Sequence, residues 1–505
     1  MNTSSFPLVI GHLSSMQVVP QQFHRWAMQL QPDIIFALPD IPCTSAPYSQ
    51  KRLTKSNERS TRWLTDLVIL REKERSHPPV MKMSDASMTT AMSGPAIFTH
   101  LVGGSALAAR DAFAENLLEP LSGRDADLLP KLDSIDEAVS GYILDLVPIR
   151  LSSSVSLGRP AHPRAPLPDE TMTPMIHASL RYLSEQKPRL ATGASTPHEI
   201  LRLINSSGID LFDSSWAQRA ADHGVALDFR FPVGNGLWSE SQVCGFARRS
   251  AALNLYDPRF ATDFSRLSGD LMSAQDAHQA QRGKKVDEDA LEKDGVLVCK
   301  CIACSPEVIT APIAHSDTDV LKGNSAEGEM RSSNNRQSKD TMTIPSDTQS
   351  PLRHFSRAYL HHLLHTHEMS AHTFLTAHNL AVLDAFFSGI RSTMAKTHDP
   401  EALGQSDASA PARTLFQKEF ARFEHIYDES LLWGTSHSDS SGNIAPAGKK
   451  ATGILEEAEQ HWREVDYLRG KGRFKREKEA ALVAATEDGG DTASVEPTKG
   501  SEVVK

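Results

Sequence analysis

Short apolar runs alternate with amphipathic stretches over the N-terminal half of the chain. The stretches that repeat apolar residues at helical spacing predict helices at Pro20–Leu30, Glu58–Arg71, Ala106–Leu117 and Pro197–Asn205. Strands that alternate with helices in this way indicate βαβ units and a parallel sheet. The apolar runs predict strands at Pro7–Ile10, Asp33–Leu38, Ala96–Val102, Gly141–Leu146, Arg189–Ala194 and Gly208–Phe212.

Such units either close into a (β/α)8 barrel of the TIM type or open into a doubly wound sheet. No glycine-rich dinucleotide-binding motif follows the first predicted strand, which favours the barrel. We therefore predict an α/β fold with a TIM-like barrel in residues 1–267. The pattern yields about six strands, fewer than a closed barrel needs, and the chain opens almost directly on a strand. We expect the barrel to be incomplete at its N-terminus.

Three later segments contain too few apolar residues to form a packed core. We predict a polar insertion at 268–298, a second domain of metal-binding and helical segments at 299–430 with a disordered insertion at 305–350, and a low-complexity tail at 431–505. The tail includes a predicted charged helix at Ile454–Ala485. The polar segments are Asp270–Asp294, Ser305–Ser350 and Ser436–Ala451.

The formal net charge of −10 excludes a generic polyanion-binding protein, so any nucleic-acid contact requires a local basic patch. One such run, Arg469–Lys478, has six basic residues in ten and could contact phosphates, although a solvated tail is the simpler interpretation. No apolar run is long enough to span a bilayer, and Met1–Leu13 has no features of a secretory signal.

The strongest chemical pattern is a cluster of cysteines. Only five cysteines occur in 505 residues, and three of them, Cys299, Cys301 and Cys304, lie within six positions. Thiolates this close cannot all form strain-free disulfides, but they can bind one zinc ion, with an imidazole as the usual fourth ligand. Composition does not choose among the nearby candidates, which are His354, His361, His362, His365, His367, His372 and His378.

Two features lie at the C-terminal ends of predicted strands, where parallel barrels place their reactive groups. Asp213 follows the strand Gly208–Phe212 and could serve as a nucleophile or general base. The alternative is a helix N-cap. Gly103 and Gly104 follow the apolar run Ile97–Val102 and would let a planar ligand or phosphate approach the backbone, or simply form a turn.

Taken in order, several segments resemble the tRNA-guanine transglycosylase family over roughly Pro7–Tyr427. The resemblance implies that His378 completes the ligand set of Cys299, Cys301 and Cys304 around one structural Zn2+ per subunit. It also implies that Asp213 matches the nucleophile of the family. The segments that carry the resemblance are Lys187–Leu190, Gly193, Gly208–Asp213, Leu255–Phe264, Cys299–Cys304, Phe355–Leu363 and Thr376–Asn379.

The sequence departs from the catalytic members of that family at several motifs. Their Asp-Ser-Gly-Gly-(Phe/Tyr)-Gln motif is absent, and Val102 replaces the glutamine that precedes the paired glycines. Ile143–Ile149 replaces a Gly-Gly-Leu-(Ala/Ser)-Val-Gly-Glu run, and Ala217–Arg219 replaces Pro-Thr-Arg. Base exchange needs both a nucleophile and proton transfer. We therefore assign no catalytic residue and regard a role for Asp213 as doubtful.

This pattern is similar to the non-catalytic accessory subunit of the family, whose early segment resembles Gln31–Ile34, Lys51–Arg52 and Arg59–Ser60. The resemblance implies a heterodimer with a catalytic homologue that exchanges guanine for queuine at the wobble position of tRNAs with GUN anticodons. It implies that the zinc subdomain lies at the subunit interface and that tRNA binds through the complex. It also implies a cytoplasmic protein, and allows peripheral association with the mitochondrial outer membrane.

Two alternatives remain open from the sequence. The chain could be an active transglycosylase that works as a homodimer and uses Asp213 as its nucleophile. It could also be a zinc-stabilised module for RNA or protein interaction that is unrelated to queuine.

Overall fold

The computed structural model describes two compact units of the chain, which we treat separately. The first comprises 1–219, 230–249 and 383–429, and the second comprises 220–229, 250–382 and 430–505. Within these bounds the structure describes residues 8–10, 16–42, 47–76, 94–156, 165–233, 248–269, 272–273, 298–306, 354–397, 413–433, 453–465 and 467.

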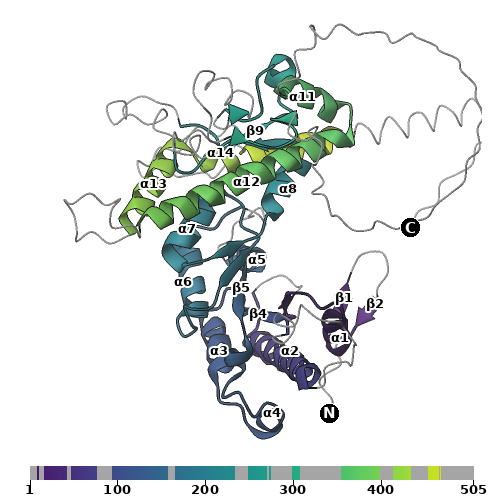
Figure 1. Ribbon diagram of the computed structural model, residues 1–505, viewed down its shortest axis with the longest axis vertical. Coiled ribbons are helices and arrows are strands. Elements are labelled where there is room, and N and C mark those ends of the chain that lie inside the picture. The colour runs from purple at the N-terminus through teal and green to yellow at the C-terminus, as the bar shows by residue number, and fades with distance from the viewer. Residues whose placement is uncertain are drawn as a thin grey trace, which may run out of the picture. The chain divides into compact units, whose positions relative to one another are not determined.

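The first unit is built on a parallel sheet of five strands in sequential order (Figure 1). Each strand pairs in parallel with the one that precedes it in the sequence. The sheet is nearly continuous in apolar side chains, as expected when both faces of a parallel sheet are covered. The strands are β3 (Ile34–Phe36), β4 (Ala96–His100), β5 (Gly141–Asp145), β6 (Arg189–Thr192) and β7 (Leu211–Phe212).

Five of the six predicted strands are confirmed as members of this sheet, but the first is not. The predicted strand Pro7–Ile10 contains β1 (Leu8–Ile10), which pairs antiparallel with β2 (Met16–Val18) in a separate hairpin. Only five residues separate β1 from β2. A connection of that length can join antiparallel strands, whereas parallel strands need a crossover of a dozen or more residues. The structure therefore supports an α/β fold with a parallel sheet.

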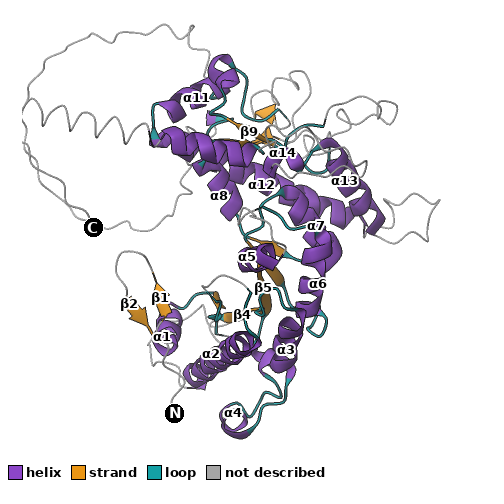
Figure 2. Ribbon diagram, turned by 180° about the vertical axis from the view of Figure 1, so that it is seen from behind, coloured by secondary structure: helices purple, strands orange, loops and turns teal. Residues whose placement is uncertain are grey.

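Helices follow the strands of the first unit, and they pack against one another in a series: α1 with α2, α2 with α3, α3 with α6 and α6 with α7 (Figure 2). The prediction for α1 (Pro20–Leu30) was correct to the residue. Three more predicted helices are α2 (Gln50–Ser76), α3 (Leu107–Leu118) and α7 (Pro197–Ser207). The pattern missed α4 (Gly123–Leu128), α5 (Leu146–Ser156), α6 (Asp169–Leu180) and α8 (Ser215–Asp222).

Aromatic side chains from distant parts of the sequence form the second part of the first unit's core. Phe231 contacts Phe386 of α12 (Met369–Thr397) and Phe423 of α13 (Arg413–Ile426), with ring centroids 6.0 and 6.2 Å apart. All three rings are buried. Gly389 allows this approach, because a Cβ at that position would overlap the carbonyl oxygen of Phe231.

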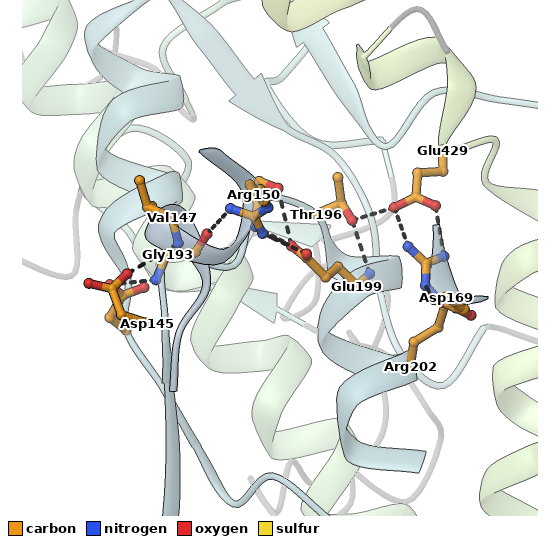
Figure 3. A network of polar contacts seen from close by, with 11 residues as sticks. Asp145, Val147, Arg150, Asp169, Gly193, Thr196, Glu199, Arg202 and Glu429 are labelled. Atoms are coloured by element: carbon orange, nitrogen blue, oxygen red, sulfur yellow. Dashed lines mark hydrogen bonds and ion pairs between the residues drawn. The ribbon is translucent and has the colours of Figure 1, made fainter. Parts of the chain in front are cut away.

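Three ion pairs joined through α7 form the network shown in Figure 3, in which Arg202 also pairs with Asp169 at 3.0 Å. Nη2 of Arg150 lies 2.5 Å from both carboxylate oxygens of Glu199, and both side chains are almost fully buried. One turn further along α7, Arg202 donates two hydrogen bonds to Glu429, at 2.7 and 2.8 Å. Thr196, the N-cap of α7, accepts from the backbone N–H of Glu199 and donates to Glu429. The start of α7 is thereby fixed on two sides.

The second unit contains two short pairs of strands and several helices. β8 (Val225–Leu227) and β9 (Ala252–Asn254) are antiparallel, and β10 (Met272–Ser273) and β11 (Val298–Cys299) are parallel. The helices are η4 (Pro258–Thr262), α11 (Arg357–His365), the first half of α12, α14 (Ser430–Trp433) and a helical segment at 454–465.

The predicted polar segments lie mostly outside the described residues. Within Asp270–Asp294 the structure describes only β10, so a strand occurs where the sequence predicted a polar insertion. Nearly all of Ser305–Ser350, and all of Ser436–Ala451 and Arg469–Lys478, lie outside what the structure describes. The predicted helix at Ile454–Ala485 is confirmed at 454–465. No helix in the described part of the chain is long and apolar enough to cross a membrane.

We predict that Arg150→Met lowers the free energy of unfolding by about 3–5 kcal/mol, because the Glu199 carboxylate would stay buried without a cation. Urea unfolding measures this change. Replacing both charges, in Arg150→Met with Glu199→Leu, should recover at least half of the loss. A double variant as unstable as the single one would show that packing, and not the unpaired charge, causes the loss.

Candidate functional site

Three cysteines and one histidine converge in the second unit. The Sγ atoms of Cys299 and Cys301 are 3.4 Å apart. Nδ1 of His378 lies 3.8 Å from each of these sulfurs and 3.4 Å from Sγ of Cys304. All four side chains are buried, and their four ligand atoms lie within 4.8 Å of one another. A tetrahedral ion with metal–sulfur distances of about 2.3 Å requires ligand separations of about 3.8 Å, close to the distances of 3.4 and 3.8 Å found here.

Local structure holds the three thiols on one side of the cluster. Cys299 ends β11, and the chain then turns so that Cys301 and Cys304 point back toward it. Ser305 closes the turn: its N–H donates to the Cys301 carbonyl and its hydroxyl donates to the Cys299 carbonyl, both at 2.8 Å. The backbone N–H of Cys304 also donates to Sγ of Cys301, at 3.3 Å. Ser305 therefore orders the loop without bonding to any of the three sulfurs.

His378 reaches the cluster from α12 with its ring orientation fixed. Its Nε2 donates to the Leu227 carbonyl at 3.0 Å, which leaves Nδ1 as the nitrogen with a free lone pair toward the sulfurs. The next residue, Asn379, accepts from the Leu227 N–H and donates to the Val225 carbonyl, both at 2.9 Å. A backbone carbonyl behind a histidine ligand is a usual feature of metal sites.

The electrostatics of the cluster also fit a cation. Hydrogen bonds from Cys299 and Cys304 hold the pKa of the Cys301 thiol below its usual range. Hydrogen bonds with Cys299 and Cys301, together with burial, raise the pKa of Cys304. A buried group of this kind cannot ionise all its thiols without a compensating positive charge. A divalent ion would supply that charge, so the donor set fits a soft metal.

The other histidines of this region have structural partners or are exposed. Four of them bond backbone carbonyl oxygens, and none belongs to the cluster. His362 and His367 are exposed. The pairs are His354 with Phe264, His361 with Leu255, His365 with Tyr256 and His372 with Ala221.

In the first unit, Asp213 lies at the C-terminal end of β7, as predicted. Its Oδ2 accepts from the backbone N–H of Gly193 at 3.1 Å, and its Oδ1 is buried and bonded to none of the described residues. The interpretation as a helix N-cap is wrong, because the N–H groups of Ala217 and Gln218 at the start of α8 donate to the carbonyl of Ser214. Asp213 instead bridges the ends of β6 and β7.

A second carboxylate, Asp145, ends β5. Its Oδ1 accepts from the N–H of Val147 at 3.1 Å. Burial, reinforced by the negative charge of Asp213, raises the pKa of Asp145. The negative charge of Asp213 therefore acts on Asp145, although each carboxylate is anchored to a different backbone N–H.

Asp145 also lines a cavity at the C-terminal edge of the sheet. Its wall includes the residues that follow β4: Leu101, Val102, Gly103 and Gly104. Both glycines have positive φ, and a Cβ at Gly103 would lie 2.7 Å from the side chain of Arg110. The paired glycines form the βα turn, which confirms that interpretation, and they also line the cavity. The approach of a ligand to their backbone stays a prediction.

The titratable side chains around this cavity are paired with other residues or are uncharged at pH 7. Asp40 is bound by Arg52 at 2.8 and 3.0 Å and by Arg59 at 3.1 Å. Arg110 donates to the Gly104 carbonyl at 2.6 Å and to Ser179, and burial lowers its pKa to about 10. Burial lowers the pKa of His100 to about 4, so its ring is neutral at pH 7.

The cavity is small. Its volume of about 30 Å³ holds one or two water molecules and is far below that of a usual small-molecule site. As lined by the described residues, this edge of the sheet offers carboxylates but no room for a nucleobase.

Sequence reasoning missed Asp40, His100, Arg110 and Asp145. A signal was available for Asp40, His100 and Asp145, since each lies at or just after the end of a strand. No sequence pattern marks Arg110, because only the tertiary structure brings it to its partners Gly104 and Ser179.

Comparison with known proteins covers both the parallel sheet with Asp213 and the cluster of three cysteines and one histidine. The sequence profile of the family described as queuine tRNA-ribosyltransferase matches residues 9–274 and 299–405. The first range contains the parallel sheet with Asp213, and the second contains all four residues of the metal cluster. The match covers well over half of the chain.

Similar proteins are named queuine tRNA-ribosyltransferase accessory subunit 2. That of Xenopus laevis is 24% identical over 78% of this chain and 70% of its own length, and that of Gallus gallus is 23% identical over 78% and 69%. That of Drosophila virilis is 25% identical over 46% of this chain. The alignment with this last relative spans only 34% of its length. On the profile match, the chain belongs to the queuine tRNA-ribosyltransferase family.

Proposed function

We propose that this chain is a non-catalytic accessory subunit of a heterodimeric queuine tRNA-ribosyltransferase, which exchanges guanine for queuine at the wobble position of tRNAs with GUN anticodons. The observation that carries the proposal is the likeness to proteins named accessory subunit 2 over about three-quarters of the chain. The partner is a catalytic homologue, and tRNA binds through the complex.

The C-terminal edge of the parallel sheet supports the absence of catalysis. Val102 and Asp145 line a cavity that admits only water. One oxygen of Asp213 accepts from the N–H of Gly193, and the other is buried. A ribosyl transfer needs a nucleophile free to attack and a group that moves protons on the bases. In this proposal Asp213 is a structural residue.

We further propose that the five sequential strands are part of a (β/α)8 barrel in residues 1–267. The strand order supports it, because a doubly wound sheet reverses its order at a switch point and this one does not. The chain of contacts from α1 through α2, α3 and α6 to α7 is that expected of an outer ring of helices. Of the predicted segment 299–430, residues 299–382 then form the zinc subdomain with its helices, while 383–429 belong to the first unit.

In this proposal Cys299, Cys301, Cys304 and His378 hold one structural Zn2+ per subunit. All four ligands come from the protein and all four are buried, which leaves no open position for a substrate. Bound zinc would supply folding energy to the second unit. The proposal places the protein in the cytoplasm, with peripheral association at the mitochondrial outer membrane as a further expectation.

The function is tested by incorporation of labelled guanine into tRNA. We expect exchange when this chain is mixed with a catalytic subunit from the same organism, and none with this chain alone. Asp213→Asn should leave the activity of the mixture within about twofold, because the amide oxygen can still accept from Gly193.

Turnover by this chain alone would contradict the accessory role. If Asp213→Asn then abolished that turnover, Asp213 would be the nucleophile of an active homodimer. A chain that neither turns over nor binds the catalytic subunit would favour an interaction module unrelated to queuine.

The metal assignment predicts one zinc per chain by elemental analysis. Cys301→Ser should lose most of the bound zinc and unfold at a lower temperature, because the energy of a structural site is folding energy. Cys244→Ser, at a cysteine outside the cluster, is the matched control and should retain the full zinc content. Equal zinc content in the two variants would contradict the assignment of Cys301 as a zinc ligand.

A further inference from the structure

A groove on the first unit lies between α2 and α3, which pack side by side, and extends to α4 (Figure 1). Its volume of about 540 Å³ is within the usual range of small-molecule sites and far above that of the cavity beside Asp145. The groove and that cavity share no lining residue. The groove is therefore separate from the edge of the sheet where Asp145 and Asp213 lie.

The charged side chains of the groove have an excess of negative charge. Glu58 of α2 and Glu119 at the end of α3 are exposed, and neither forms an ion pair with any of the described residues. A third carboxylate, Asp125 of α4, lies 3.2 Å from Arg62, the one cation of the described lining. Arg62 is also paired with Asp66 at 3.1 Å, so it does not balance the carboxylates. The groove therefore favours a cationic ligand.

The hydroxyl groups along α2 offer the groove acceptors. Thr54 and Thr65 each donate the hydroxyl proton to a carbonyl one helical turn earlier in α2, at 3.0 Å, which leaves the oxygen lone pairs. Oγ1 of Thr61 is buried and has no partner within the described part of the chain. A ligand with several N–H groups would find acceptors along this wall.

Asn57 gives an independent reason to expect a donor in the groove. The residue lines the groove but is only 4% exposed. Its Nδ2 donates to the Ala109 carbonyl of α3 at 2.7 Å, which keeps the amide from turning round. Its Oδ1 is therefore an acceptor, and it is buried with no partner among the residues described. A buried acceptor without a donor is costly, so a ligand that donates here is favoured.

The carboxylates of the groove are not arranged as the ligands of a metal ion. They come from three different elements, and among the described residues only the cluster of three cysteines and His378 brings three or more such ligand groups together. The wall on α3 is largely apolar, because Ala108, Ala109 and Ala112 present methyl groups there. Separated anionic groups beside an apolar wall match a chain of methylene groups that carries several ammonium groups.

We propose that the groove between α2 and α3 binds a linear aliphatic polyamine, with Glu58 and Glu119 as counter-ions of its ammonium groups and with its methylene groups packed on the alanines of α3. Such amines are protonated at pH 7, as the lysine side chain is. The site uses no residue of the metal cluster and none of the edge of the sheet, so it does not depend on the accessory role.

Calorimetric titration of spermidine into the purified full-length chain tests the proposal. We expect saturable binding of one spermidine per chain. Glu58→Gln combined with Glu119→Gln should weaken binding about tenfold, because two exposed charge interactions are lost. Both side chains are exposed, so the double variant should keep the unfolding temperature of the wild type.

A second variant tests the shape of the groove without changing its charge. Ala112→Leu should reduce spermidine binding at least as strongly, because the larger side chain would occupy the space beside α2. Leucine is a good helix former, so α3 should keep its helix content by circular dichroism. Unchanged binding by this variant would place the ligand elsewhere.

The matched control combines Glu74→Gln of α2 with Glu115→Gln of α3, which removes the same charge outside the groove and should keep the wild-type affinity. An equal loss in both double variants, or equal competition by Mg2+, would show diffuse attraction of cations and overturn the proposal. The absence of saturable binding would also overturn it. Binding of a lysine-rich peptide but not of spermidine would make the groove a peptide-docking surface instead.

Discussion

Strand β8 has only one partner strand among the described residues, and the helix α12 bonds the backbone groups that this partner leaves free. Two consecutive residues do this work. Asn379 binds the N–H of Leu227 and the carbonyl of Val225, and His378 donates to the carbonyl of Leu227. Buried backbone groups without partners are costly, so this contact fixes the helix against the strand. The same contact aims Nδ1 of His378 at the three sulfurs. The metal cluster and the packing of the second unit therefore depend on one arrangement.

Hydrogen bonds within the protein are enough to bring the four ligand side chains together. The cysteine loop is closed by Ser305, and the histidine is oriented by a backbone carbonyl. Each element brings its ligand into place with bonds of its own, and the thiols remain available. Zinc would then act by joining β11 to α12, which are separated by a long stretch of sequence. A structural ion is most effective where it closes such a long loop.

The parts of this fold that the sequence predicted are those that local patterns determine. Five strands and the helix α1 were predicted because apolar periodicity and Pro20 at the first helical position mark them directly. The cysteines were found by their spacing, but His378 was chosen only by family resemblance. Seven histidines look alike in sequence, and what separates them is which backbone carbonyl each one meets in the tertiary structure. The same limit applies to Arg110, whose partners are set by the fold.

The outcome for Asp213 shows how a residue in a catalytic position can have a structural role. Its carboxylate holds the N–H of Gly193, and the carbonyl of Gly193 accepts from Arg150 at 2.7 Å. Arg150 is paired with Glu199 at the start of α7, so the chain of bonds runs from the end of β7 into the helix that connects β6 to it (Figure 3). Removing the carboxylate would loosen this turn whether or not any chemistry takes place there. An aspartate at this strand end therefore does not by itself indicate catalysis, because the same carboxylate helps to hold the turn between β6 and α7.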